Sequence, residues 1–113
     1  MIDALLWDGG SFGFTLDIAL PESAVGSYLA DVYGRRGTLS GRIAALAPTM
    51  KVAGPALTVE VRPGDNLMIH AALSIARPGD VIIVDGKGDQ TCALVGEIMV
   101  SQAMAIGVAG MVL

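Results

Sequence analysis

The strongest candidate for binding chemistry is a short segment that opens the last helical stretch of the chain. Gly96 and Glu97 stand directly before an apolar run with helical spacing. A glycine at a helix start leaves the first backbone N–H groups accessible, and the helix dipole adds positive potential there. Carboxylates and phosphates bind at such helix starts. Gly96, Glu97, Ile98 and Met99 are therefore candidates for a carboxylate pocket; the alternative is a packing glycine followed by a solvated glutamate.

A second candidate is the polar loop Asp85–Asp89, which follows the apolar run Val81–Val84. Proteins with parallel sheets place ligands at the carboxyl ends of their strands. We therefore predict an active-site loop here, with Asp85 and Gly86 as weaker candidates, against the alternative of a plain surface turn. The loop lacks the full G-x-G-x-x-G pattern, so a nucleotide or methyl-donor site is a poor interpretation.

The other reactive side chains favour structural roles. His70 is the only histidine, and nothing near it in sequence supplies an anion-binding nest, so a structural or interface role is predicted. A single cysteine, Cys92, gives no disulfide framework, and we expect it to serve as a small apolar residue. Three methionines are predicted to fill gaps in the core: Met99, Met104 and Met111.

The elements that position these residues follow from hydrophobic spacing and from glycine and proline breaks. A helix is expected from Pro21 to a stop at Gly34, and an irregular connector from Gly41 to Met50. Ala56–Val61 alternates in polarity and predicts a half-buried strand. Asp65 can cap the next helix, whose predicted apolar face comprises Leu67, Met68, Ala71, Ala72 and Ile75.

The second half of the chain continues this alternation. Val81–Val84 is apolar without a break, which predicts a strand covered on both faces. A helix is expected over Gly96–Ile106, with Gly107 as its stop, and a buried strand over Ala109–Leu113. Strands that alternate with helices predict an α/β domain with right-handed crossovers.

Composition excludes several classes of protein. Hydrophobic residues make up 53% of the 113 residues and charged residues 16%, which excludes disorder. A net charge of -4 argues against a nucleic-acid partner, because little would neutralise the phosphates. The longest uncharged run, Ile98–Leu113, is shorter than the ~20 residues of a spanning helix, so no membrane partner is expected. With no signal peptide visible near Met1, we expect a cytoplasmic location.

Two longer stretches, PGDNLMIHAALSIARPGDVIIVDGKGD and GEIMVSQAMAIGVAGMVL, resemble the RraA-like family, which includes 4-hydroxy-4-methyl-2-oxoglutarate aldolase and regulators of ribonuclease activity. The resemblance implies a swivelling β/β/α fold over residues 21–113, after a poorly defined segment 1–20. It also implies homotrimers with active sites between subunits, and a divalent cation such as magnesium or manganese.

The chemistry implied by the resemblance is retro-aldol cleavage of 4-hydroxy-4-methyl-2-oxoglutarate or 4-carboxy-4-hydroxy-2-oxoadipate type substrates. The products are pyruvate and a second 2-oxo acid, and oxaloacetate decarboxylation is the usual side activity. In the family, main-chain amides at the positions of Gly96–Met99 hold the pyruvyl carboxylate. The acid at the position of Glu97 orders metal-bound water, and the loop at Asp85 and Gly86 lines the mouth of the site.

The family's D-G-x-x-R-D loop, which carries the metal ligand and a substrate arginine, is expected just past Leu113. We therefore expect an incomplete RraA-like domain with no direct metal ligand of its own, either a fragment of a longer reading frame or a truncated relative without the lyase activity. By itself we expect the chain to be inactive. The alternative is a non-catalytic protein-binding regulator of the ribonuclease E inhibitor type, which shares the fold.

Overall fold

The computed structural model describes residues 25–32, 34–36 and 38–113. Helix α1 spans Val25–Val32, followed by a turn in which Gly34 has φ 69°. The helix expected before Gly34 is therefore present, while its expected start at Pro21 and the whole of segment 1–20 lie outside the described residues. The connector Gly41–Met50 is irregular, as predicted.

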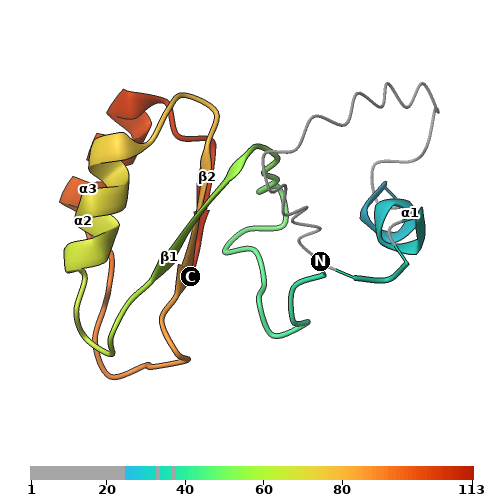
Figure 1. Cartoon of the computed structure of the whole chain (residues 1–113), viewed down its shortest axis with the longest axis horizontal. Coiled ribbons are helices and arrows are strands. Elements are labelled where there is room, and N and C mark those ends of the chain that lie inside the picture. Colours follow the sequence, from blue (N-terminus) through green and yellow to red (C-terminus); the bar gives the residue numbers. More distant parts are fainter. Residues whose placement is uncertain (1–24, 33, 37) are drawn as a thin grey trace.

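The second half of the chain forms a three-stranded parallel sheet with two crossover helices, both on the same face of the sheet (Figure 1). Strand β2 lies between β1 and β3, so the α/β prediction is confirmed. The elements are β1 (Ala56–Glu60), α2 (Leu67–Ile75), β2 (Val81–Asp85), α3 (Glu97–Ile106) and β3 (Gly110–Val112). No helix among the described residues is long and apolar enough to span a membrane.

The core lies between the sheet and the two helices. Ile69 and Leu73 of α2 and Ile82 of β2 are its largest fully buried side chains. Val59 and Val61 face this core while Thr58 and Glu60 are exposed, which confirms the half-buried strand. In β2, Val81, Ile82 and Val84 are buried and Ile83 is only half-buried, so its second face is covered in part.

The apolar face predicted for α2 is wrong. Of its five residues only Ala72 is buried, and the helix packs through Ile69, Ala72 and Leu73 instead. Leu67, Met68 and Ile75 are 53–68% exposed. Helix α2 carries apolar residues on nearly every side, so helical spacing cannot select the buried face, and packing against β1 does so.

Two further packing predictions are also wrong. Met104 is 73% exposed on the outer side of α3, whereas Met99 is buried and Met111 packs against the core. Cys92 is exposed. Its Sγ lies beside Gly64: a Cβ added to that glycine would be 3.5 Å from the sulfur. The thiol therefore packs against a glycine turn and is not part of the core.

Candidate functional site

Helix α3 begins with an open turn of backbone amides. Gly96 is its N-cap residue, and it supplies no side-chain hydrogen bond to the helix start. The first intrahelical bond runs from the Val100 N–H to the Gly96 carbonyl oxygen, at 3.1 Å. The N–H groups of Glu97, Ile98 and Met99 therefore have no acceptor within the helix, and these three groups are called the α3 amide turn below.

Neither backbone strain nor crowding explains a glycine at position 96. Its φ of -122° and ψ of 175° are extended values that any residue adopts. A Cβ built there meets no atom within 4 Å. The packing-glycine interpretation therefore finds no support among the described residues. What the glycine does provide is unobstructed access to the α3 amide turn.

The side chains of the predicted pocket point in different directions. Ile98 is 84% exposed, and Glu97 is also exposed, whereas Met99 is buried in the core. Only the backbones of these residues share one site. The Glu97 carboxylate, in the first turn of the helix, is stabilised by the positive end of the helix dipole.

Two loops at the carboxyl edge of the sheet meet beside this turn. The loop after β1 begins at Val61, and the Asp65 carboxylate accepts the N–H of Leu67 at 2.9 Å. Asp65 therefore supplies an acceptor to the helix start, as predicted, but from the position before the N-cap residue. Asn66, the next residue, leaves its own helix uncapped by its side chain. Its Nδ2 instead lies 3.7 Å from the Met99 Sδ, so Asn66 joins the start of α2 to the first turn of α3.

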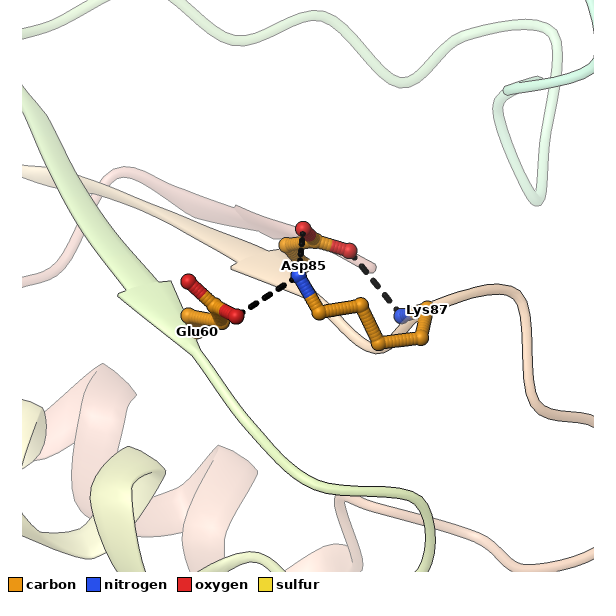
Figure 2. A network of polar contacts seen from close by, with 3 residues as sticks. All are labelled: Glu60, Asp85 and Lys87. Atoms are coloured by element: carbon orange, nitrogen blue, oxygen red, sulfur yellow. Dashed lines mark hydrogen bonds and ion pairs between the residues drawn. The ribbon is translucent and has the colours of Figure 1, made fainter.

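The loop after β2 is built on Asp85, as the sequence indicates, but its chemistry involves two residues that the sequence analysis missed. The Lys87 ammonium lies 2.7 Å from an Asp85 oxygen and 2.7 Å from a Glu60 oxygen (Figure 2). Glu60 and Asp85 are partners in the strand register. The sequence does show a lysine between two glycines and a glutamate at the end of a strand. It does not show that the two side chains lie together, because that depends on the strand register.

This network is on the face of the sheet away from the helices. Val59 and Val84 face the core, so the adjacent Glu60 and Asp85 point to the opposite side. The structure thus brings Asp85 and Gly86 to the same edge of the sheet as the α3 amide turn, while the Asp85 carboxylate is held by Lys87.

The network shifts the pKa values of Asp85 and Lys87. The side-chain hydrogen bond from Lys87 lowers the pKa of Asp85, and hydrogen bonds to Asp85 and Glu60 raise the pKa of Lys87. A lowered carboxyl pKa gives stability that is present above the unfolded value and is lost as the pH falls through the folded one. A raised lysine pKa gives stability that is lost only as the pH rises through the folded value. Asp85 and Lys87 are therefore both charged across the neutral range.

Another carboxylate in this loop is engaged locally. One Asp89 oxygen accepts the N–H and the hydroxyl of Thr91, at 3.1 and 2.8 Å, and the hydroxyl bond in particular lowers the pKa of Asp89. Its other oxygen is enclosed with no hydrogen-bond partner. His70 is exposed on α2, so it has no place in the core, and the interface role stays a prediction.

Comparison with known proteins supports the motif resemblance. The family model described as RraA-like, Aldolase/RraA, matches residues 4–113. The chain belongs to the RraA-like family. It is 40% identical over 84 residues to a Halalkalibacterium halodurans protein named "Putative 4-hydroxy-4-methyl-2-oxoglutarate aldolase", which covers 74% of this chain and 40% of the relative.

Two further relatives are also named putative 4-hydroxy-4-methyl-2-oxoglutarate aldolases. A protein of Arabidopsis thaliana is 38% identical over 80 residues, covering 65% of this chain and 48% of the relative. One from Burkholderia multivorans is 40% identical over 79 residues, covering 67% of this chain and 48% of the relative. The chain thus spans less than half the length of these relatives, while their shared name indicates an aldolase, that is a lyase, family.

Proposed function

We propose that the protein is a lyase that cleaves 4-hydroxy-2-oxo acids by a retro-aldol reaction, and that this chain contributes the pocket for the 2-oxo acid carboxylate. The substrates would be of the 4-hydroxy-4-methyl-2-oxoglutarate or 4-carboxy-4-hydroxy-2-oxoadipate type, and the products pyruvate and a second 2-oxo acid. The observation that carries the proposal is the α3 amide turn, left open by Gly96 in a chain whose relatives are named aldolases.

In this proposal the amides of Glu97, Ile98 and Met99 bind the pyruvyl carboxylate and orient the rest of the substrate. A carboxylate suits this turn because it accepts N–H groups that lack partners within the helix and interacts favourably with the dipole. The bound carboxylate would bring the adjacent 2-oxo group close to the first turn of α3. There the Glu97 carboxylate would hold a water molecule by hydrogen bonding and orient it toward the reacting carbonyl.

We further propose that the activity requires a divalent cation, magnesium or manganese. Such an ion, when bound, would act as a Lewis acid on the 2-oxo carbonyl. Within the described residues, however, no three His, Cys, Asp or Glu side chains gather into a group that could hold a metal ion. Of the predicted site residues, Glu97 alone offers an uncommitted carboxylate, so these residues do not by themselves form a coordination site.

The exposed surface of helices α2 and α3 is relevant to how the protein associates with other chains. Large apolar side chains are exposed on the outer sides of the two helices: Leu67, Met68, Ile75, Ile98 and Met104. Exposed apolar surface of this kind commonly marks protein contacts. It supports subunit contacts in the enzyme, for which we propose a homotrimer from the family resemblance. It is also the observation that favours the second candidate function, a non-catalytic regulator that binds a protein partner.

One assay separates the two functions. The protein expressed from its full reading frame, purified with magnesium or manganese, is incubated with 4-hydroxy-4-methyl-2-oxoglutarate, and pyruvate release is followed by a coupled dehydrogenase. The lyase proposal expects metal-dependent turnover, and slower carbon dioxide release from oxaloacetate. No pyruvate above the uncatalysed rate with either metal would contradict the lyase and favour the regulator.

A further inference from the structure

Lys87 has a geometry that the proposed reaction does not account for. It adopts a left-handed backbone conformation, with φ 59°, which residues other than glycine rarely adopt. Its neighbours on both sides are glycines, and Gly88 also has a left-handed conformation, with φ 70°. Such a conformation persists where the surroundings of the residue hold it in place.

The contacts of Lys87 show what holds it there. Its N–H donates to one Asp85 oxygen at 2.9 Å, and its ammonium donates to the other at 2.7 Å. The same ammonium pairs with Glu60 of the neighbouring strand at 2.7 Å (Figure 2). Glu60 and Asp85 are register partners on one face of the sheet, where like charges repel. Lys87 therefore neutralises this repulsion and fastens the loop after β2 to the ends of two strands.

A packed contact links this fastening to the α3 amide turn. A Cβ on Gly86 would stand only 2.9 Å from Leu94 Cδ1, so the backbone next to Lys87 lies directly against the Leu94 side chain. Leu94 is buried in the core and precedes Gly96 by two residues. The loop is thus fixed at Lys87 on one face of the sheet and at Leu94 on the other, immediately before the amide turn.

We propose that Lys87 is a positioning residue: its ion pairs with Asp85 and Glu60 hold the loop after β2 so that the α3 amide turn keeps the shape needed to bind a carboxylate. The carboxylate part of this inference rests on the proposed function, whereas the structural part does not. Lys87 acts through the backbone and contacts no reacting atom in this proposal.

The test uses the protein from its full reading frame, with its metal. Lys87→Met removes the charge and keeps the length of the side chain, Lys87→Gly also relieves the backbone conformation, and Lys87→Arg keeps the charge. Arg35→Met is a matched control. Arg35 has φ 60° and an exposed ion pair with Asp31 at 2.9 Å, but it lies beside α1, far along the chain from the loop.

The first measurement is amide hydrogen exchange without ligand. Because exposed ion pairs are individually weak, Lys87→Met and Lys87→Gly should speed exchange across residues 86–99 by about two- to tenfold. Lys87→Arg should restore the wild-type rate, and Arg35→Met should leave this segment unchanged. Wild-type exchange of residues 86–99 in both Lys87→Met and Lys87→Gly would overturn the proposal.

The second measurement is steady-state kinetics with the 2-oxo acid substrate. Lys87→Met should raise KM by about two- to tenfold with little change in kcat, because a looser amide turn weakens substrate binding rather than the chemical step. A fall in kcat at constant KM would overturn the positioning role. If the wild-type protein has no lyase activity, the proposed function fails, and hydrogen exchange alone still decides whether Lys87 positions the turn.

Discussion

Replacing Gly96 with valine should damage activity far more than it damages the fold. Valine prefers extended backbone, and position 96 has φ -122° and ψ 175° with no atom within 4 Å of a Cβ. The substitution therefore neither strains the backbone nor creates a clash. Its cost to folding is the poorer N-cap preference of valine relative to glycine, about 1 kcal/mol.

The effect on activity follows from the geometry of the α3 amide turn. Side-chain atoms of an N-cap residue reach toward the N–H groups two and three residues further on, here Ile98 and Met99. A methyl group of valine at this position is therefore expected to obstruct at least one hydrogen bond to the substrate carboxylate. A hydrogen bond to a charged group contributes about 1.5–3 kcal/mol. Its loss should lower kcat/KM by about tenfold to a hundredfold.

A matched control separates these effects. Gly41 lies in the irregular connector, has no atom within 4 Å of a built Cβ and does not have a left-handed φ, so Gly41→Val makes the same chemical change away from the site. The assay is pyruvate release with the melting temperature measured on the same samples. Equal kcat/KM for Gly96→Val, Gly41→Val and wild type would refute the reasoning that Gly96 keeps the amides open.

Three further predictions concern neighbouring residues. Glu97→Ala should lower kcat/KM by about 10–100-fold, because residues that orient water near a metal commonly have effects of this size. The free energy of unfolding should fall by only about 0.3–1 kcal/mol. Wild-type turnover in this variant would exclude Glu97 from the site. Asp65→Ala removes the acceptor for the Leu67 N–H and should reduce the free energy of unfolding by about 1 kcal/mol in chemical denaturation, whereas Asp65→Asn should retain most of it. In Lys87→Met, the loss of melting temperature relative to wild type should be constant across the neutral range. It should shrink as the pH falls below about 4, the ordinary value for an aspartate, and disappear as the pH falls through the lowered pKa of Asp85. A difference that grows on acidification would contradict the direction of the Asp85 shift.

The elements bounded by strong breaks were predictable from the sequence. Helix α3 was expected over Gly96–Ile106 and is found over Glu97–Ile106. Gly107 ends it with φ 88°, and its N–H donates to Ala103 and Met104. Glycines at both ends define this helix without any tertiary information, because one opens the first turn and the other takes a left-handed conformation. The position of the candidate carboxylate pocket follows from the first of these boundaries.

Features that depend on packing or register were not predictable. The buried face of α2 was assigned to residues such as Leu67 and Ile75, both of which are exposed, because nearly every side of that helix is apolar. The pairing of Lys87 with Glu60 was missed because the two residues are far apart in sequence. Only the parallel register, which places Glu60 beside Asp85, brings them together.

The central claim is that the backbone N–H groups of Glu97, Ile98 and Met99 bind the carboxylate of a 2-oxo acid. The most direct test is a two-dimensional amide NMR titration of the protein from its full reading frame with pyruvate. The account predicts that these three amide signals show the largest shifts, that they saturate together, and that Gly96→Val weakens the binding. Saturable pyruvate binding that leaves these three signals in place, or no binding at all, would contradict it.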